Sequence, residues 1–580
     1  MKLRALALDY DGTIAQDGVL NVDVKTAIAE ARAHGLIVVL VTGRVLSDLK
    51  CVAGEDLSFL DAVIAENGAV LAFPNGYSRL IGQSAPQALL EEFRRRGIDF
   101  TTGQCVLEAD AAFAPKILDV IRDMQLPLVL MFNRSRLMVL PQGVSKSVGL
   151  RRALTVLHLS PHNAIAVGDA ENDHDLLAAC EFGVAVAWGS PALCKIADQV
   201  LSGAGPEAVA PFVRQAAEEW KIPPSRMQRH QIALGTARDG HTVALSVSGR
   251  NLLVSGDPRS GKSWITGLTC EKLILQGYSV CVIDPEGDYR TLESLPGVVV
   301  FGGNEPQPRL PDIARVLRHP DMSVVVDLSH LAYKDKIDYL HSVLPMVAAV
   351  RRATGLPHRI VIDEAHYFLH DPSGRQLLDL SLNAYTLVTY RPSDLSLDLR
   401  AGIEAIVVKR MTDPSQVATL LNMACEQGFD TDWKTALESL EPNQAALLPG
   451  PEEAEGKFRS FELLPRLTSH VRHKTKYFDL ELIDELGFVF TDNGKPVGQP
   501  ACTLQEFVLA LKTYPTSVLE GHVHRGDFSQ WILDVFHDPI LATDIRKIEH
   551  RYRLGHIRDL CSSIGAAIDG RYELSLEKCG

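Results

Sequence analysis

The sequence predicts an α/β multidomain protein in which two sheet-containing regions precede a small helical domain. Its 580 residues are too many for one hydrophobic core, and at the usual size of a domain they correspond to about three to five domains. Two series of short apolar runs, bounded by Gly, Pro or Asp, alternate with amphipathic segments, as buried parallel strands and crossover helices do. After residue 470 the apolar residues instead recur at helical spacing.

The first series spans residues 1–202. Its predicted strands contain the runs ALALD, LIVVLVTG, AVIAENG, LMVLP and AIAVGD. A stretch at about 74–140 interrupts the series and is predicted to be an inserted α+β unit. Residues 203–224, a helical segment followed by KIPPS, are predicted to be a linker.

The second series spans residues 225–469, where short β-like runs lead into SVCVIDPEG, SVVVDLS, RIVIDEAH and YTLVTYRPS. Each of these is an apolar strand that ends in polar residues. Residues 470–580 form the predicted helical domain. Its aromatic residues at expected core positions, for which base stacking is the alternative role, are Phe528, Trp531 and Phe536. The basic run from Arg472 to Lys476 either contacts phosphate or is a solvated linker.

Composition narrows the classes of partner and compartment. The formal net charge of −14 argues against a passive nucleic-acid coat, so a nucleic-acid contact would need a local basic surface. The 10 cysteines contain no CxxC pair, which favours reduced thiols over a disulfide framework or a zinc site. The chain starts directly with a strand and its longest apolar runs are strand-length, so we expect a cytoplasmic protein that makes no membrane contact.

The first candidate site follows the first predicted strand, where DYDGT places Asp9 and Asp11 at the carboxyl edge of a sheet. Open α/β sheets bind ligands at this edge. A carboxylate there can attack phosphorus and form an aspartyl-phosphate if a cation neutralises the approaching anions. The second acid can protonate the leaving group and then activate water. A purely structural acidic turn is the alternative.

Three further motifs follow in order. VTGR places Thr42 at the end of the next strand, where its hydroxyl can bind a phosphoryl oxygen. GVSKS offers Lys146 as a point charge for the same phosphate. VGDAENDHDLL adds Asp169 and Asp173, oxygen ligands of the type that Mg²⁺ selects. Two nearby residues are left out of the predicted site because their positions are often only structural: Arg44 at a helix start and Asn67 in a turn.

Together DYDGT, VTGR, the isolated lysine and GDAEND resemble the haloacid dehalogenase phosphatase superfamily, and AENGA with GVSK points to its Cof-like branch. That branch includes sugar-phosphate and phosphoglycolate phosphatases. The resemblance implies a Rossmann-like domain over residues 1–202 whose insertion at 74–140 is a cap that contacts substrate. It implies Asp9 as nucleophile and Asp11 as acid/base; a degenerate fold kept as a scaffold is the alternative. The implied Mg²⁺ ligands are Asp9, the Asp11 backbone and Asp169, with Asp173 nearby.

The second candidate site is a GxxxxGKS motif between an apolar strand and a helical stretch. Glycines let backbone N–H groups wrap phosphates at a helix N-terminus, so the motif predicts ATP binding. The motif residues are Gly256, Asp257, Pro258, Arg259, Ser260, Gly261, Lys262 and Ser263. Lys262 is expected to reach the β- and γ-phosphates, and Ser263 to ligate Mg²⁺. In RIVIDEAH, Asp363 suits the same metal and Glu364 can polarise the attacking water.

The stretch from IALGT to the P-loop, with CVIDPEGDY and TYRPSDL, resembles the HerA- and FtsK-type pumping ATPases over about residues 225–465. The resemblance implies a RecA-like domain, a homo-oligomeric and usually hexameric ring, and movement of DNA or sometimes protein. It suggests Arg391 or Arg410 as phosphate-sensing or inter-subunit arginines; pairing of Arg391 with Asp394 is the alternative. The family commonly has glutamine where this chain has Tyr390, which puts coupling of hydrolysis to movement in doubt.

These observations leave several functions open. The first is a ring-forming ATPase that engages nucleic acid and carries a phosphatase acting on a phosphate ester. The second is a metabolic phosphatase of a small phosphate ester whose P-loop domain is an ATP-dependent regulator or assembly device. A bifunctional kinase and phosphatase is the weakest, because no acceptor-site motif is visible. DNA-stimulated ATP hydrolysis would favour the first, and ATP-dependent turnover of a small ester the second.

Overall fold

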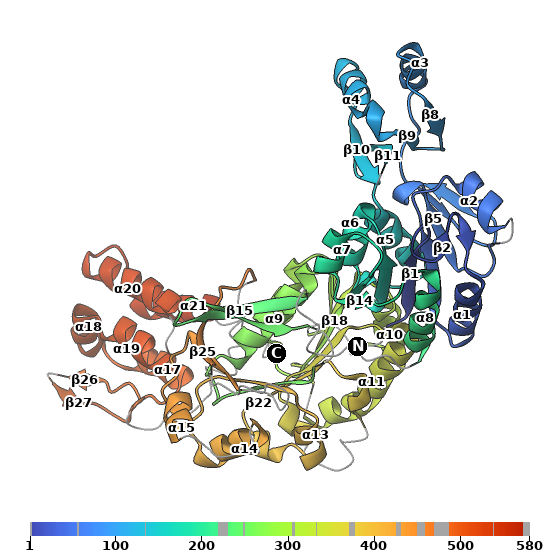
Figure 1. Ribbon diagram of the computed structural model, residues 1–580. Coiled ribbons are helices and arrows are strands. Elements are labelled where there is room, and N and C mark those ends of the chain that lie inside the picture. Colours follow the sequence, from blue (N-terminus) through green and yellow to red (C-terminus); the bar gives the residue numbers. More distant parts are fainter. Residues whose placement is uncertain are drawn as a thin grey trace. The chain divides into compact units, whose positions relative to one another are not determined.

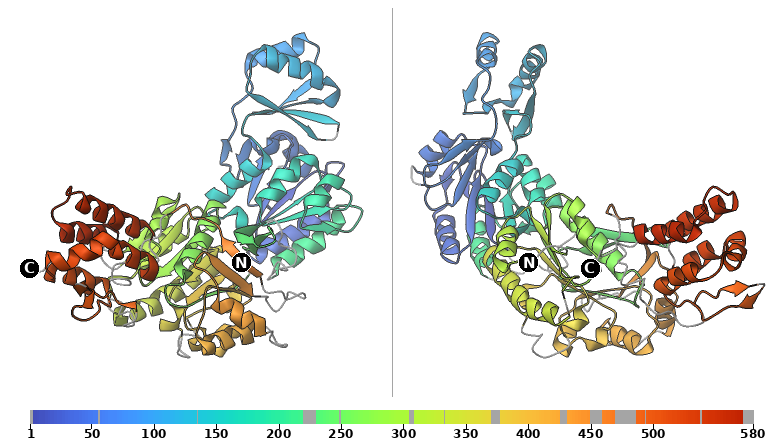
Figure 2. Two further views of the ribbon diagram at one scale, coloured as in Figure 1. Left: turned by 90° about the vertical axis from the view of Figure 1, so that its left-hand side faces the viewer. Right: turned by 180° about the vertical axis from the view of Figure 1, so that it is seen from behind.

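The structure is a computed structural model that describes residues 3–54, 57–133, 135–218, 230–247, 250–303, 308–331, 333–369, 377–424, 431–448, 459–468, 486–492, 494–536 and 539–571. Its described part confirms the predicted fold class, with α/β sheets followed by a helical C-terminal region (Figures 1 and 2). Among these residues, no helix combines the length and apolar content that a membrane span requires. The basic run from Arg472 to Lys476 lies outside the described residues.

Contacts within the chain divide it into two compact units. The larger unit is Met1–Pro285 with Leu292–Leu467, and the smaller is Glu286–Thr291 with Thr468–Gly580. The larger unit contains an eight-stranded sheet and an eleven-stranded sheet. We call the region built around the first sheet the N-terminal domain and the region built around the second the P-loop domain.

The sheet of the N-terminal domain has the order β14-β13-β12-β1-β4-β5-β6-β7. The strands from β14 to β5 are parallel, and β6 and β7 are antiparallel. The strands are β1 (Ala5–Asp9), β4 (Ile37–Val41), β5 (Ala62–Ala65), β6 (Val70–Ala72), β7 (Ser78–Leu80), β12 (Ala164–Gly168), β13 (Phe182–Val186) and β14 (Gln199–Leu201). A short hairpin, β2 (Ala15–Gln16) with β3 (Val19–Leu20), follows β1.

Helices cover both faces of this sheet. The alternation of a strand sends Leu6 and Leu8 into the core beneath α1, α2 and α8, while Ala5 and Ala7 face α5, α6 and α7. Burial on both faces explains why ALALD is a continuous apolar run. The helices are α1 (Val22–Ala33), α2 (Leu46–Ala53), α5 (Lys146–Val156), α6 (His174–Ala179), α7 (Pro191–Ile196) and α8 (Val209–Ala217).

A separate four-stranded antiparallel sheet, β10-β11-β9-β8, carries two helices and forms the cap. Its core joins Leu107 and Leu137 of the sheet to Phe93 and Ile117 of the helices. The elements are α3 (Gln87–Arg95), β8 (Phe100–Thr102), β9 (Leu107–Asp110), α4 (Ala114–Asp123), β10 (Leu128–Asn133) and β11 (Arg136–Pro141).

Two elements near predicted domain boundaries pack against the N-terminal domain. Strand β7 falls inside the expected insertion at 74–140, yet it pairs with β6 in the main sheet. Helix α8 falls inside the expected linker at 203–224, yet it packs against α1, where Arg214 pairs with Asp23 and Glu30. Residues 219–224 lie outside the described residues.

The sheet of the P-loop domain has the order β16-β15-β25-β24-β23-β17-β22-β21-β18-β20-β19. Its seven strands from β23 to β19 are parallel, and the other four are antiparallel. The strands are β15 (Gln231–Ala237), β16 (Thr242–Ser246), β17 (Leu252–Ser255), β18 (Val280–Asp284), β19 (Val298–Gly302), β20 (Ser323–Asp327), β21 (Arg359–Ile362), β22 (Tyr385–Thr389), β23 (Ala405–Val408), β24 (Gln444–Leu448) and β25 (Arg459–Leu463).

Helix α9 (Lys262–Leu275) follows the P-loop and contacts β15, β17 and β22. A buried cluster joins the sheet residues Leu253, Ile283 and Ile362 to the remaining helices. These helices are α10 (Leu310–Leu317), α11 (Tyr333–Thr354), α13 (Leu397–Ala401), α14 (Pro414–Ala424) and α15 (Thr431–Glu438).

Buried polar contacts join the N-terminal and P-loop domains within the larger unit. His162 Nδ1 lies 3.0 Å from Glu181 Oε2, and His162 Nε2 lies 2.9 Å from the carbonyl oxygen of Gln276. The Tyr278 hydroxyl donates to the same Glu181 oxygen at 2.7 Å, and its ring stacks on His162. Because Gln276 caps the helix that begins at the P-loop, this helix extends from the P-loop to the N-terminal domain.

The smaller unit is a helical bundle with a short hairpin. Its elements are β26 (Thr491–Asp492), β27 (Lys495–Pro496), α17 (Leu504–Thr513), α18 (Thr516–Arg525), α19 (Asp527–Phe536), α20 (Pro539–Arg553) and α21 (Leu560–Arg571). Phe528, Trp531 and Phe536 are buried in its core, which confirms the predicted core role over base stacking. Helix α17 begins with a capping box in which Thr503 and Glu506 bond each other's backbone N–H groups.

Candidate active sites

Parallel strands bring the acidic motifs of the N-terminal domain together. Strand β1 lies between β4 and β12, so Asp9 at the end of β1 is flanked by Thr42 after β4 and Asp169 after β12. Lys146 begins α5 and is almost completely buried at the same edge. The sequence motifs therefore converge on one point, as predicted.

Lys146 forms ion pairs with two buried carboxylates. Its Nζ lies 2.5 Å from Asp9 Oδ1 and 2.6 Å from Asp173 Oδ1, and Thr13 donates its hydroxyl to Asp9 Oδ2 at 3.1 Å. Burial, followed by the charge of Asp173, raises the pKa of Asp9 well above its ordinary value. Burial lowers the pKa of Lys146, but the charges of Asp173 and Asp9 outweigh that effect and raise it overall.

The acidic cluster has the donor set of a divalent-cation site. One carboxylate oxygen from each of Asp9, Asp169 and Asp173 lies within 4.8 Å of the others, and all three residues are buried. Oxygen ligands of this kind suit Mg²⁺. Asp173 also accepts hydrogen bonds from the N–H groups of Asp169 and Ala170, and so fixes the loop after β12. A Cβ on Gly168 would lie 2.6 Å from the Asp173 carboxyl carbon, which explains the glycine.

Arg44, which was left out of the predicted site, contacts the predicted acid Asp11. Its Nε and Nη2 donate to both carboxylate oxygens of Asp11 at 2.6 and 2.7 Å, and its Nη1 donates to Asp48 at 2.8 Å. Hydrogen bonding to Asp11 raises the pKa of Arg44. Thr42 Oγ1 accepts the Arg44 backbone N–H, which positions this arginine at the start of α2. The VTGR motif was the available signal, because it places an arginine two residues after the hydroxyl.

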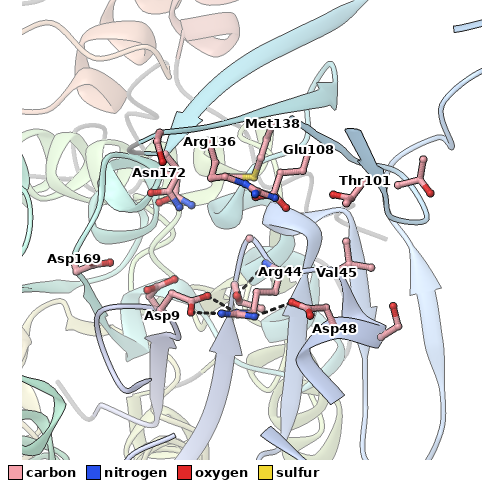
Figure 3. A pocket seen from close by; sticks show the side chains of 17 residues that line it. Asp9, Arg44, Val45, Asp48, Thr101, Glu108, Arg136, Met138, Asp169 and Asn172 are labelled. Carbon is pink, nitrogen blue, oxygen red and sulfur yellow. Dashed lines mark hydrogen bonds and ion pairs between the residues drawn. The ribbon is translucent and has the colours of Figure 1, made fainter. Parts of the chain in front are cut away.

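A cavity of about 610 Å³ lies between the cap and the carboxyl edge of the sheet, where Asp9 lies. The strand alternation in the cap turns Leu107 and Leu137 toward its helices, and Glu108 and Arg136 toward the cavity. Figure 3 shows Arg136 with Glu108 and Met138 on the side opposite Asp9 and Arg44. The cap residues that line the cavity are Thr101, Thr102, Glu108, Asn133, Ser135, Arg136 and Met138. Arg136 Nε donates to Glu108 Oε1 at 2.6 Å.

The second site is the P-loop between β17 and α9. Gly256 and Gly261 have φ values of 158° and 97°, and Gly261 caps α9 in the left-handed region that favours glycine. Lys262 Nζ donates to the carbonyl oxygens of Gly256 and Asp257 at 3.1 and 3.0 Å. The Asp257 carboxylate accepts from the N–H and hydroxyl of Thr412, which anchors the loop.

The acidic pair of the P-loop domain lies one strand away from the P-loop strand. Strand β22 separates β17 from β21, and Asp363 and Glu364 directly follow β21. Both side chains are buried, and Glu364 has a φ of 46°, which is strained for a residue with a side chain. His366 Nδ1 lies 3.5 Å from Glu364 and 3.1 Å from the Thr389 hydroxyl at the end of β22.

Tyr390 occupies the space between the two motifs. Lys262 Nζ lies 5.6 Å from the centre of its ring, and the His366 ring packs edge-on at 4.4 Å. The residue that departs from the resembled family therefore contacts both the P-loop lysine and the histidine beside Glu364.

The two candidate sensor arginines lie near this site. Arg391 lies 3.8 Å from Asp394 and has a half-exposed side chain, so the pairing considered as its alternative role is present. Arg410 is exposed, and its carbonyl oxygen accepts the N–H of Asp257 at 2.8 Å within the same chain.

The fold and the two sites define an enzyme with a phosphatase domain and a P-loop ATPase domain. A family model for haloacid dehalogenase-like hydrolases matches residues 6–102 and 125–213, and one for the central domain of helicase HerA matches residues 237–355. Phosphoglycolate phosphatase of Methanothermobacter thermautotrophicus is 30% identical over 226 residues, which are 37% of this chain and 98% of that protein. The chain belongs to the haloacid dehalogenase-like hydrolases. Both resemblances drawn from the sequence motifs are confirmed.

Two further relatives have the same coverage pattern. Phosphoglycolate phosphatase of Methanopyrus kandleri is 28% identical over 225 residues, 36% of this chain and 96% of that protein. Among solved structures, a haloacid dehalogenase-like hydrolase from B. subtilis is 18% identical and covers 37% of this chain and 99% of its own, with a TM-score of 0.32.

Proposed function

We propose that the N-terminal domain hydrolyses a small phosphate ester through an aspartyl-phosphate on Asp9, with Mg²⁺, and that the P-loop domain is a ring-forming ATPase acting on or with nucleic acid. The observation that carries the first half is the convergence of Asp9, Lys146 and Asp169 at one sheet edge beneath a cavity. This arrangement joins a nucleophile, a fixed cation and a metal-ligand set.

In the proposed mechanism an Asp9 oxygen attacks phosphorus and the bond from phosphorus to the ester oxygen breaks. Asp11 gives its proton to the leaving alkoxide, then takes a proton from the water that attacks the aspartyl-phosphate, releasing phosphate and restoring Asp9. Lys146 holds Asp9 in place and adds a positive charge. A Mg²⁺ ion held by Asp9, the Asp11 backbone and Asp169, with Asp173 nearby, would supply charge neutralisation for the phosphoryl oxygens.

Arg44 imposes a requirement on this mechanism. Because its guanidinium holds both oxygens of Asp11, one of these hydrogen bonds must open before Asp11 can carry a proton. An anionic group of the substrate would compete for the same guanidinium. The cavity also contains Arg136. The two arginines favour an ester with a second negative charge, and 2-phosphoglycolate, named by the relatives, is the first candidate.

The experiment for the phosphatase half uses the full chain. We expect phosphate release from 2-phosphoglycolate and from p-nitrophenyl phosphate in MgCl₂, with loss of both in EDTA and recovery on adding Mg²⁺ back. Hydrolysis that continues at full rate in EDTA would contradict the metal requirement.

For the P-loop domain, Lys262 would exchange its bonds to loop carbonyls for the β- and γ-phosphates of ATP. Ser263 and Asp363 would hold the metal of the nucleotide, and Glu364 would polarise the attacking water. The strained backbone of Glu364, which fixes its side chain beside His366, supports this assignment.

We also propose a homo-hexameric ring in which an arginine of one subunit, Arg410 or Arg391, completes the ATP site of its neighbour. The similarity to the HerA central domain supports this assembly. ATPase activity per subunit is expected to rise with protein concentration and with added DNA. Mixing Arg410→Ala subunits into wild-type rings should depress activity by more than their fraction; a strictly proportional loss would place the arginine in its own subunit's site.

The alternative is a metabolic phosphatase whose P-loop domain regulates it or assembles it. The net charge of −14 and the buried contacts between the two domains favour this function. It predicts that ATP changes turnover of the small ester while DNA leaves ATP hydrolysis unchanged. A monodisperse monomer with full ATPase activity would shift the choice to it.

A further inference from the structure

The turn after β5 connects the N-terminal domain to the cap at a point outside the proposed catalytic machinery. The 3₁₀ turn η1 (Glu66–Gly68) contains Glu66, which is 0% exposed. Glu66 and Asn67 both have a φ of 53°, in the left-handed region that is strained for a non-glycine residue. A buried carboxylate in strained backbone requires a compensating interaction.

The cap supplies that interaction through backbone N–H groups. Glu66 Oε1 accepts the N–H of Gln104 at 2.8 Å, and Oε2 accepts those of Cys105 and Val106 at 2.8 and 3.2 Å. These three donors belong to the turn between β8 and β9, which is closed by a 2.8 Å bond from Gly103 N–H to the Val106 carbonyl. Successive N–H groups of one turn form a concave site for an anion, and here the anion is a side chain of the neighbouring domain.

The contact between Glu66 and the Gly103–Val106 turn leaves no space for a side chain at Gly103. A Cβ on Gly103 would lie 2.5 Å from the carboxyl carbon of Glu66, so only glycine allows the approach. The carboxylate also contributes, after burial, to raising the pKa of the Cys105 thiol to about 11.

The η1 turn also contacts other parts of the phosphatase site. Asn67 Nδ2 donates to Met131 Sδ of the cap at 3.0 Å, and Asn67 Oδ1 accepts from Asn172, which lines the cavity. A Cβ on Gly68 would lie 1.9 Å from the carbonyl oxygen of Ser145, so the turn packs directly against the start of the helix that carries Lys146. The turn therefore links the cap to the residue that holds the nucleophile.

We infer that Glu66 is a positioning residue that clamps the Gly103–Val106 turn and thereby holds the cap closed over the phosphatase site. Thr101 and Thr102 directly precede the clamped turn and line the cavity, so the clamp sets where the cap meets the substrate. This inference rests on the proposed phosphatase function for its kinetic consequence, whereas the clamp itself is a structural claim with its own readout.

The kinetic test uses Glu66→Gln in the full chain with 2-phosphoglycolate and p-nitrophenyl phosphate. The amide keeps the shape of the side chain but turns an NH₂ group toward N–H donors, so the turn loses part of its anchor. We expect KM for the better substrate to rise at least about tenfold while kcat changes less than about threefold, with Glu66→Asp between Gln and wild type. Glu92→Gln, a cap carboxylate that pairs with Arg95 and Arg96, is the matched control and should match wild type.

A loss confined to kcat, or unchanged kinetics in Glu66→Gln, would overturn the positioning role. The second measurement is independent of catalysis and uses thermal unfolding. Gly103→Ala should lower the melting temperature by at least about 2–4 °C because its methyl group meets Glu66. In a Glu66→Ala background the same change should cost nothing further, since the methyl group then has space. Equal costs in both backgrounds would refute the clamp, and an inactive wild type with this coupling intact would refute only the phosphatase proposal.

Discussion

At the scale of single residues, the chemistry of both sites could be predicted because the reacting groups lie in short motifs. Asp9 ends β1, Asp169 follows β12 and Lys146 begins α5, and the parallel sheet brings these ends together. Arg44 and Glu66 could not be assigned in the same way. Arg44 bonds an acid 33 positions earlier, and Glu66 bonds N–H groups 38 to 40 positions later. Neither distance leaves a periodic signal in the sequence.

Lys146 should be needed for stability as well as for activity. Replacing it by Met leaves Asp9 and Asp173 buried without their common cation, and uncompensated buried charge costs about 3–5 kcal/mol. We expect Lys146→Met to lower the free energy of unfolding by this amount in EDTA and to reduce ester hydrolysis at least about a hundredfold. Urea unfolding and phosphate release measure the two effects. Lys195→Met, an exposed lysine of the same domain, should change neither; hydrolysis within about threefold of wild type in Lys146→Met would contradict the role.

At the scale of elements, the apolar runs predicted the buried strands because parallel strands covered on both faces are continuously hydrophobic. Peripheral elements such as β7 and α8 were harder to place from the sequence. The strand β7 is exposed along its length and has no apolar pattern, so the predicted insertion began before it. Helix α8 was amphipathic in the sequence, but its partner α1 lies almost two hundred residues away, as the 184- and 191-residue separations of its ion pairs show.

A buried ion pair joins the helix that follows the P-loop to Arg466. Arg466 Nε donates to Glu271 of α9 at 2.8 Å, and the two side chains are 0% and 1% exposed. Glu271→Ala removes the carboxylate from this buried guanidinium, so we expect a loss of about 3–5 kcal/mol from the unfolding free energy of the larger unit. The control is Glu438→Ala, which breaks a partly exposed pair with Lys434 and should cost under about 0.5 kcal/mol. Similar unfolding curves for the two variants would show that the buried pair contributes little.

At the scale of the whole molecule, the sequence indicated separate domains but not how they meet. The contact between the N-terminal and P-loop domains depends on single polar residues, such as His162 and Tyr278, that carry no motif. Their pairing across about a hundred residues, 97 for the Tyr278–Glu181 bond and 114 for the His162–Gln276 bond, appears only in the folded chain. Because this contact is buried, we expect the two domains of the larger unit to unfold together.

This interface should be sensitive to acid. His358 Nδ1 accepts the Ser279 N–H and its Nε2 donates to Asn163, so the folded state holds the neutral ring. Burial, followed by the charges of His162 and Arg351, lowers the pKa of His358 well below its ordinary value. The rings of His162 and Tyr278 pack edge-on against this ring, and Arg351 donates to the backbone carbonyl oxygen of His358.

Below about pH 6.5 His358 binds a proton in the unfolded chain but not in the folded chain. The free energy of unfolding therefore falls as the pH falls below this value, by about 1.4 kcal/mol per pH unit. His358→Gln can make both hydrogen bonds without titrating, and should remove this part of the acid slope. Unfolding measured from pH 7.5 to 5 tests the expectation. An identical slope in His358→Gln and wild type would assign the acid sensitivity to other groups.

A crossed pair of variants distinguishes two separate phosphate-handling sites in one chain from a single site that hydrolyses both substrates. Asp9→Asn removes the charge of the nucleophile, and Lys262→Ala removes the cation expected at the γ-phosphate. Phosphate release from 2-phosphoglycolate or p-nitrophenyl phosphate and from ATP should be measured in both variants. We predict that Asp9→Asn loses ester hydrolysis at least about a thousandfold and keeps ATP hydrolysis, while Lys262→Ala does the reverse. If Asp9→Asn abolished ATP hydrolysis and Lys262→Ala left it intact, ATP turnover would belong to the N-terminal domain and the two-site account would be wrong.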